Sequence, residues 1–255
     1  MPYLDEPPLA FAHRGGAATG DENTTAAFAR AVDLGYRYLE TDVRATADGV
    51  PVVFHDRTLA RMTGRPDRVA AVRWADLATV RVGGAAAVPR LDDVLDAWPK
   101  VRFNIDVKDD RAVRPTIDAV RRTAAGPRVL LASFRDARLV AMRAELGDTV
   151  VTSLGTGETA RLWLASRRAR TGRRKPQRVP PTAVAAQVPI RYRGLKVVDR
   201  RFVGYAHGLG LQVHVWTVDD PALMHELLDL GVDGIMTDHV ETLRDVYLAR
   251  GHWPP

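Results

Sequence analysis

The sequence predicts one α/β domain with the (β/α)8 TIM-barrel fold, and three observations lead to this prediction. Short apolar segments rich in branched residues alternate with longer segments of helical periodicity, which is typical of repeated strand and helix units around a parallel sheet. Eight such strands fit into the 255 residues, which suits a barrel of this class. Charged residues follow several of the strands, where the catalytic residues of such barrels gather. We expect a single domain over residues 1–255.

The elements follow in order along the chain. A helix over 25–34 begins after Asn23 and Thr24 and ends at Gly35, and a helix over 221–230 begins with Pro221 in its first turn and ends at Gly231. The eight expected strands cover 9–13, 38–44, 101–108, 129–134, 150–153, 183–188, 213–217 and 234–237.

The segment after the second strand is longer than one crossover helix requires. It runs from Thr46 to Pro99 and contains the turn Asp48-Gly49, an apolar stretch over 50–54 and an amphipathic segment over 91–98. We interpret it as a small insertion, about residues 46–99, that lies above the mouth of the barrel and brings His55 over it. No second domain, repeat or low-complexity tract is expected.

The composition excludes several classes of function. The chain has no cysteine, so disulfides, thiolate zinc sites and a cysteine nucleophile are excluded. The first residues carry acids and prolines where a signal peptide has a basic and then an apolar region, and no stretch approaches the ~18 apolar residues of a membrane span. A cytoplasmic protein is expected. The formal charge of +6 is only a weak sign of anionic partners, and no nucleic-acid binding is expected.

A basic run over 167–178 contains no acid. It precedes the sixth strand, so we place it at the bottom of the barrel, opposite the mouth. A solvated loop is expected there, and peripheral contact with an anionic lipid surface is the alternative.

Two histidines stand where phosphodiester chemistry needs a proton donor and a proton acceptor. His13 is followed by Arg14-Gly15-Gly16, in which the glycines let the backbone approach a ligand and Arg14 can bind phosphate oxygens. His55 is followed by Asp56, which can orient its ring. Their reference pKa of ~6.5 suits acid and base work at neutral pH. The alternative is that both are ordinary turn or strand-end histidines.

Three carboxylates and a lysine follow the second and third strands. Glu40 and Asp42 point to one face, about 6.6 Å apart along the strand, and Asp106 and Lys108 share a face of the next strand by the same parity. Such carboxylates repel each other unless a cation neutralises them. Oxygen ligands favour calcium or magnesium, so one divalent cation is expected, and pairing with arginines at the rim is the alternative.

These residues resemble the glycerophosphodiester phosphodiesterase family, from Phe11 to Val240. The resemblance rests on His13-Arg14-Gly15, Glu22-Asn23-Thr24, Glu40-Thr41-Asp42-Val43, Gly49-Val50-Pro51-Val52-Val53-Phe54-His55-Asp56, Val215-Trp216-Thr217-Val218 and Gly231-Val232-Asp233-Gly234-Ile235-Met236-Thr237-Asp238. The family is a (β/α)8 barrel with a small insertion after the second strand, as expected here from the strands.

The resemblance implies a role for each candidate residue. His13 and His55 are the acid and base pair, Arg14 and Lys108 hold the phosphate, and Trp216 packs against the glycerol. It implies Glu40, Asp42 and Asp106 as metal ligands. Two positions depart from the family, which usually has glutamate at Asp106 and proline at Asp21. A shorter carboxylate at 106 puts the identity and affinity of the metal in question.

The predicted function is metal-dependent hydrolysis of glycerophosphodiesters to glycerol 3-phosphate and an alcohol, within lipid and glycerol metabolism. One alternative is a lysophospholipase D-type enzyme, which needs an apolar groove near the mouth, and another is a barrel that binds phosphodiesters or anionic membrane without turnover. The sequence leaves open the leaving alcohol, calcium or magnesium, water attack or a cyclic phosphate, which histidine is the acid, and the oligomeric state. His214 shares a face with Trp216 and is expected to be a buried core histidine.

Overall fold

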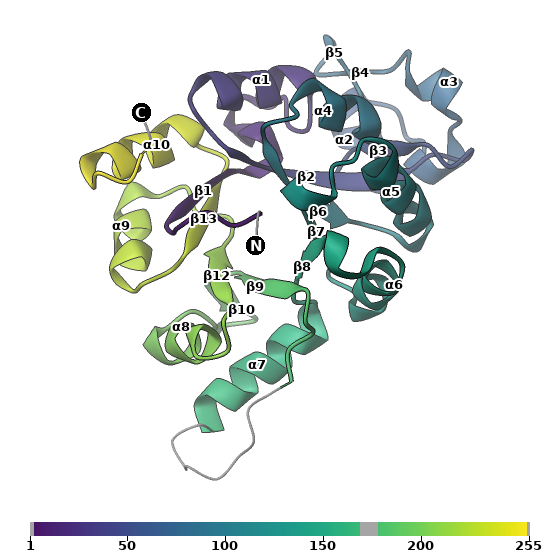
Figure 1. Cartoon of the computed structure of the whole chain (residues 1–255). Helices are drawn as coiled ribbons and strands as arrows, with labels where there is room; N and C mark the ends of the chain where they lie inside the picture. The colour runs from purple at the N-terminus through teal and green to yellow at the C-terminus, as the bar shows by residue number, and fades with distance from the viewer. Residues whose placement is uncertain (1–2, 169–177, 254–255) are drawn as a thin grey trace.

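The computed structural model describes residues 3–168 and 178–253. At its centre eight parallel strands form a closed barrel surrounded by helices (Figure 1). The strands in order around the ring are β1 (Leu9–Ala12), β13 (Gly234–Thr237), β12 (Gln212–Val215), β9 (Ala183–Val188), β8 (Val151–Ser153), β7 (Val129–Ala132), β6 (Arg102–Val107) and β2 (Tyr38–Ala45), and β1 pairs with β2 to close it. The predicted barrel is confirmed, and each predicted strand is present with its ends within two residues.

Eight helices of the described residues surround or flank the barrel. They are α1 (Thr25–Asp33), α4 (Leu91–Ala97), α5 (Asp110–Arg122), α6 (Asp136–Leu146), α7 (Thr156–Arg168), α8 (Arg200–His207), α9 (Pro221–Asp229) and α10 (Val240–Ala249). Thr24 caps α1 by accepting a hydrogen bond from the backbone NH of Ala27, and Asp220 caps α9 in the same way. The two helices predicted from their end signals are therefore confirmed, each one residue shorter than expected.

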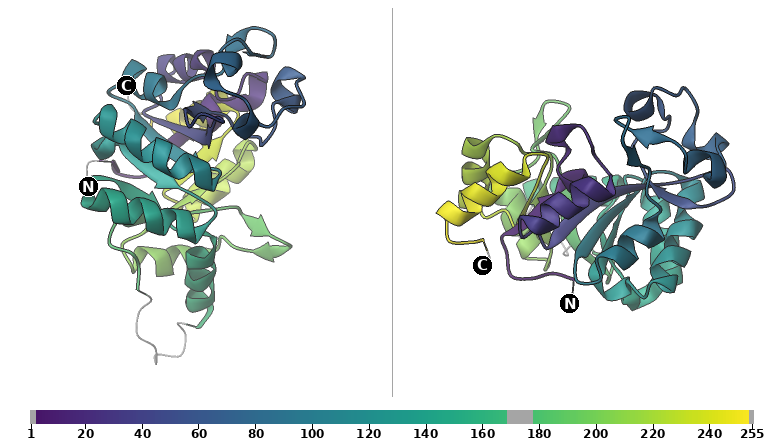
Figure 2. Two further views of the ribbon diagram at one scale, coloured as in Figure 1. Left: turned by 90° about the vertical axis from the view of Figure 1, so that its right-hand side faces the viewer. Right: turned by 90° about the horizontal axis from the view of Figure 1, so that it is seen from above.

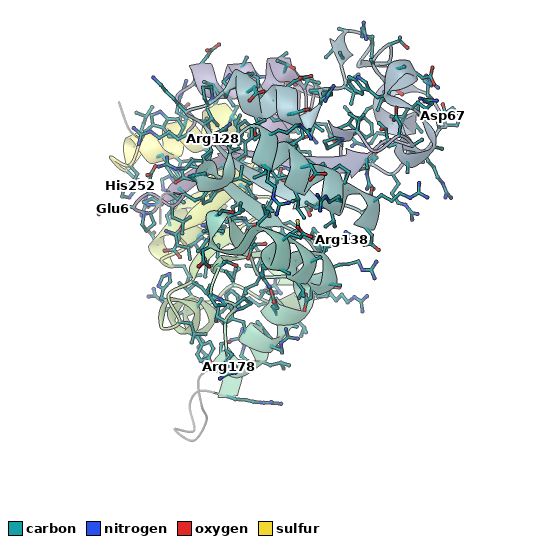
Figure 3. The ribbon with its side chains drawn as sticks, turned by 45° about the vertical axis from the view of Figure 1, so that its right-hand side comes forward. Glu6, Asp67, Arg128, Arg138, Arg178 and His252 are labelled. Atoms are coloured by element: carbon teal, nitrogen blue, oxygen red, sulfur yellow. The ribbon has the colours of Figure 1, made fainter. Side chains whose placement is uncertain are left out.

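The insertion after β2 packs around a small apolar cluster of its own. Its strand β3 (Pro51–Val53) pairs antiparallel with β2, and it continues through α2 (Ala60–Thr63), α3 (Trp74–Leu77) and the hairpin of β4 (Arg81–Val82) and β5 (Ala86–Ala87). The cluster extends from Val52 to Val88. Figure 3 shows Asp67, from this insertion, at the opposite end of the molecule from Arg178.

The segment over 91–98, expected within the insertion, belongs to the barrel. Leu91, Val94 and Leu95 of α4 are buried in the main core together with strands β2 and β6. The physical reason is the amphipathic pattern itself, because the apolar face of α4 needs a large apolar surface and the barrel provides one. The separately packed part thus ends before α4.

The barrel interior below the mouth is filled by side chains. His214 is fully buried there and hydrogen bonds to Gln187 and Gln212, and burial lowers its pKa to about 3. The predicted buried core histidine is confirmed. No helix of the described residues is long and apolar enough to span a membrane.

A small hairpin lies beyond the barrel wall on the side of β9. The hairpin of β10 (Arg191–Tyr192) and β11 (Leu195–Lys196) stands out from the body of the molecule (Figure 2). Most of the basic run, residues 169–177, falls outside the described residues, so the expectation for it is untested. The first residue of the run, Arg167, lies in the last turn of α7 and pairs with Asp199.

Candidate active site

The structure brings all of the predicted site residues to one cavity. It has a volume of about 520 Å³ and lies at the carboxyl ends of the barrel strands. The predicted residues that line it are His13, Arg14, Glu40, Asp42, His55, Asp106, Lys108 and Trp216.

His13 follows β1 directly and is held by carboxylates from both neighbouring strands. Its Nδ1 lies 2.6 Å from Oδ1 of Asp238, which follows β13, and its Nε2 lies 3.8 Å from Oε2 of Glu40 on β2. Burial opposes the charged form of the ring, but Glu40 and Asp238 outweigh it and raise the pKa of His13. The surroundings of His13 therefore favour the protonated ring.

The loop after His13 turns sharply back onto the barrel. Arg14 has a φ of 52°, and Gly15 and Gly16 have φ values of 83° and 95°. A Cβ on Gly15 would lie 2.8 Å from Phe28 of α1, and one on Gly16 would lie 2.9 Å from Val240 of α10. The sequence suggested that these glycines allow approach to a ligand, whereas in the structure they allow the loop to pack against two helices.

Arg14 is fixed by three carboxylates. Its backbone NH donates to Oε2 of Glu40 at 3.1 Å, its NH1 donates to Oε1 of Glu22 at 3.0 Å, and its Nε lies 3.1 Å from Oδ2 of Asp42. Burial opposes its charge, but Asp42 and Glu22 raise its pKa further. A fixed, charged guanidinium at the cavity wall can bind an anionic group.

The carboxylates of β2 and β6 meet at one level of the barrel, because Asp42 pairs in register with Asp106. Nζ of Lys108 lies 2.7 Å from Oδ1 of Asp42 and 2.6 Å from Oδ2 of Asp106. Burial raises the pKa of Glu40 and the negative charge of Asp42 adds to this, whereas Lys108 and Arg14 overcome the burial of Asp42 and lower its pKa. The alternative to a metal was pairing with arginines, and in this structure Arg14 lies at Asp42 while Lys108 contacts both Asp42 and Asp106.

The donor set fits a hard divalent cation in its chemistry. It offers carboxylate oxygens from two adjacent strands, and Oδ1 of Asp106 is buried without a hydrogen-bond partner. Within the described residues, however, no three His, Asp or Glu side chains are arranged so as to hold an ion. Nζ of Lys108 lies between the carboxylates of Asp42 and Asp106. It must turn away before the oxygens of these two residues can bind a metal.

His55 reaches the cavity from the insertion and is held by a chain of charges. Its Nδ1 lies 2.6 Å from Oδ1 of Asp56. Arg61 of α2 donates to Asp56 from Nε at 2.8 Å and to Oε1 of Glu22 from NH2 at 2.6 Å. Because Glu22 also accepts from Arg14, these five residues connect the ring of His55 with the guanidinium of Arg14.

The pKa of His55 shifts in the direction opposite to that of His13. Burial lowers the pKa of His55, and the carboxylates of Asp42 and Asp56 offset this only in part. Hydrogen bonds from Arg61 lower the pKa of Asp56 to about 2, so Asp56 is charged at neutral pH. His55 is therefore suited to accept a proton where His13 is suited to give one.

Trp216 lines the other side of the cavity. It follows β12, and its ring meets that of Phe134, which follows β7, at a centroid distance of 5.6 Å. Nζ of Lys108 lies 5.6 Å from the centroid of Phe134. Phe134 thus stands between the charged cluster and the aromatic side of the cavity.

Two residues of the site were missed as functional groups by the sequence reasoning. Asp238 contacts His13 only because the last strand of the barrel pairs with the first. Its position directly after the eighth strand was the signal that could have revealed it. Arg61 gave no such signal, since its role depends on the fold of the insertion. Asn23, part of the Glu22-Asn23-Thr24 motif, donates to Oδ2 of Asp42 at 2.8 Å.

The amino-acid sequence matches the model of the Glycerophosphoryl diester phosphodiesterase family over residues 13–242. It is 42% identical over 246 residues to the protein of Mycobacterium tuberculosis (strain H37Rv) named probable glycerophosphodiester phosphodiesterase 2, covering 96% of this chain and 92% of the relative. A human relative named lysophospholipase D is 26% identical, with 91% and 84% covered. An Oleispira antarctica phosphodiesterase, solved with the product sn-glycerol-3-phosphate, shares the fold with a TM-score of 0.75 at 19% identity, covering 94% of this chain and 96% of that one.

Proposed function

This chain belongs to the glycerophosphoryl diester phosphodiesterase family, and from this premise we propose that it hydrolyses glycerophosphodiesters to sn-glycerol 3-phosphate and an alcohol. One observation of the site supports this most directly. Two histidines whose pKa values shift in opposite directions line one cavity together with Arg14 and Lys108. A barrel that only binds phosphodiesters has no need of such a pair.

In the proposed reaction His55 is the base and His13 is the acid. His55 takes the proton of the attacking hydroxyl as its oxygen bonds to phosphorus, and His13 gives its proton to the alcohol oxygen as the bond from that oxygen to phosphorus breaks. Asp56 and Asp238 hold the two rings by their Nδ1 atoms, which leaves each Nε2 for the substrate side. The attacking hydroxyl is that of water, or that of the glycerol through a cyclic phosphate.

Arg14 and Lys108 are proposed to hold the phosphate oxygens. Both are charged, and both already contact carboxylates at the cavity wall. Arg14 is fixed before the substrate arrives and stabilises the charge that develops in the transition state, and Lys108 joins it once it has turned away from Asp42 and Asp106. Trp216 is proposed to pack against the glycerol.

We propose one divalent cation, calcium or magnesium, with Glu40, Asp42 and Asp106 as its ligands. Such an ion, when bound, stabilises negative charge on the phosphoryl oxygens. The support is the oxygen donor set and the unpartnered Oδ1 of Asp106. A single domain over residues 1–255 and a cytoplasmic location stay predictions.

The test uses purified protein that is stripped with a chelator and resupplied with calcium or magnesium separately. Glycerophosphocholine is the substrate, and release of glycerol 3-phosphate is measured for the wild type, for His13→Ala and for His252→Ala. His252 is an exposed histidine near the carboxyl terminus and serves as the matched control. We expect metal-dependent release that falls roughly 100- to 10,000-fold in His13→Ala alone. Absence of release with either metal would contradict the proposed function.

A further inference from the structure

Two oxygens on β6 are buried without a hydrogen-bond partner. Among the described residues, six buried side-chain nitrogen or oxygen atoms lack such a partner. Only two of these six accept hydrogen bonds without donating them, and they are Oδ1 of Asn104 and Oδ1 of Asp106. Both residues line the active-site cavity. A buried acceptor without a partner destabilises the folded chain, so two of them at one cavity indicate a bound group.

Asn104 lies beside the carboxylates that are proposed as metal ligands. It points to the same face of β6 as Asp106, because residues two apart on a strand share a face. It also pairs in register with Glu40 of β2, as Asp106 pairs with Asp42, and adjacent strands lie about 4.8 Å apart. Asn104 is 2% exposed and Glu40 is 5% exposed. The amide is therefore fixed within the barrel next to the acids.

The other neighbours of Asn104 do not explain why an amide stands at this position. On its other side Asn104 pairs with Leu130 of β7, which is fully buried. Its Nδ2 donates to Sδ of Met236 on β13 at 4.0 Å, and a thioether is a weak acceptor. A leucine would fill the same space without a polar atom. The polar neighbour of Asn104 along the sheet is Glu40, so its oxygen serves the acidic side of the barrel.

The oxygens of Asp42, in contrast, are already occupied. Lys108 contacts Oδ1, whereas Asn23 donates to Oδ2 and Nε of Arg14 lies 3.1 Å from it. The expected carboxylates thus offer few free oxygens, in agreement with the finding that no three acidic or histidine side chains in the described part of the chain can hold an ion. An amide oxygen from Asn104 adds to this set.

We infer that Asn104 is a further ligand of the divalent cation, through Oδ1, beside Glu40 and Asp106. The inference rests on the proposed function, because it concerns the cation proposed for the same site. An amide oxygen adds a ligand without adding negative charge, so it does not increase the repulsion among the acids. Calcium takes about six to eight oxygen ligands, including amide oxygens, whereas magnesium keeps several waters. Asn104 therefore favours calcium over magnesium.

The first test measures metal binding directly, by titration calorimetry of the chelator-treated protein with calcium or magnesium. Asn104→Leu is compared with the wild type and with Gln187→Leu, which removes an amide of β9 from the same cavity. The Kd for calcium is expected to rise roughly tenfold or more in Asn104→Leu, and the Kd for magnesium is expected to rise less. The control is expected to keep the wild-type values. A wild-type Kd for calcium in Asn104→Leu, or an equal rise in the control, would overturn the inference.

The second test measures Tm with and without calcium. Asn104→Leu removes a buried oxygen that has no partner, so its Tm without metal is expected to equal or exceed that of the wild type. Calcium is expected to raise this Tm less than it raises that of the wild type. Loss of stability without metal, combined with the full wild-type response to calcium, would make Asn104 a structural residue and overturn the inference.

Asn104→Asp is a second variant that keeps an oxygen at the same position. Its added charge lies beside Glu40 and Asp106, so the Tm without metal is expected to fall. Its Kd for calcium is expected to be no higher than that of the wild type, because an oxygen ligand is retained. Weaker calcium binding in Asn104→Asp than in the wild type would count against a direct ligand at this position.

The inference and the proposed function fail in different ways. A wild type that binds calcium more tightly than Asn104→Leu, but does not hydrolyse glycerophosphocholine, contradicts the proposed function and supports the inference. Calcium-dependent hydrolysis by the wild type, together with an unchanged Kd for calcium in Asn104→Leu, contradicts only the inference.

Discussion

The two halves of the barrel mouth differ in how their side chains are held. In the charged half, His13, Arg14 and Lys108 each contact at least two carboxylates, and most of these groups are buried or half-buried. The apolar half comes from the segments that follow β7, β8 and β9. Its residues Leu164 and Leu195 line the cavity and are exposed. A buried charge is costly unless it is paired, so each residue of the charged half depends on its neighbours. The apolar half carries no such constraint.

This difference suggests that the two halves of the cavity have different roles. In the proposed reaction the charged half acts on the phosphodiester bond, which all substrates share. In the apolar half, burial of area matters more than the placement of single atoms. Substitutions are expected to have large effects in the first half and small ones in the second.

The largest effect is expected from Lys108→Met, which removes the charge between Asp42 and Asp106. Breaking a buried ion pair costs about 3–5 kcal/mol, which corresponds to a fall in Tm of roughly 10 °C for a chain of this size. Calcium or magnesium is expected to restore part of this loss, because the ion replaces the missing charge.

Thermal unfolding with and without metal checks this prediction, and Lys100→Met, at an exposed lysine, is the control. A wild-type Tm for Lys108→Met without metal would show that the charged half does not depend on its pairs.

Arg61→Gln tests whether the insertion takes part in the charged half. Arg61 is 48% exposed, so its loss is expected to lower stability by less than ~1 kcal/mol. Asp56 and Glu22 lose their shared partner, however, and kcat is expected to fall roughly 10- to 100-fold. Steady-state kinetics beside Arg65→Gln, whose partner is the local Asp67, separates the two effects. A change in Tm without a change in kcat would leave Arg61 a purely structural residue.

The pH dependence of activity tests the roles of the two histidines. Asp238 raises the pKa of His13, and Asp56 raises that of His55, so asparagine at either position lowers the pKa of its histidine. An acid loses activity as pH rises through its pKa, so the upper limb of the profile is expected to move to lower pH in Asp238→Asn. A base loses activity as pH falls through its pKa, so the lower limb is expected to move to lower pH in Asp56→Asn.

Profiles of kcat/KM across the neutral range measure both limbs, and each variant is expected to lose roughly tenfold in activity through the missing hydrogen bond. Movement of the lower limb in Asp238→Asn would reverse the assignment of acid and base.

Trp216→Ala gives the smallest expected effect, since it changes the apolar half near its border with the charged one. Loss of the ring that meets Phe134 is expected to raise KM for glycerophosphocholine about three- to tenfold with little change in kcat. Initial rates over a range of substrate concentrations show this. A large fall in kcat with an unchanged KM would place Trp216 in the charged half by function.

Local patterns were sufficient to predict much of the site. The alternation of side chains along a strand placed Glu40 with Asp42 and Asp106 with Lys108, and the carboxyl ends of the strands placed these residues at one mouth. The residue that follows His55 in the sequence, Asp56, orients it as expected. These predictions depend on backbone geometry over a few residues, which the sequence determines directly.

Contacts between distant segments could not be predicted in the same way. Asp238 reaches His13 only through closure of the barrel, and Arg61 reaches Glu22 only through the fold of the insertion. The assignment of α4 to the barrel also depended on which apolar surface was available to it.

The fold class, the eight strands and the set of groups that carry the chemistry follow from the amino-acid sequence, because strand periodicity and local motifs are properties of neighbouring residues. How these groups are charged, and which side chains share the cavity with them, depends on the folded molecule. Burial and the carboxylates of other strands shift the pKa values of His13 and His55 apart, and the folded chain brings Trp163 and Leu164 of α7 to the same cavity. Both depend on distances between segments far apart in the chain.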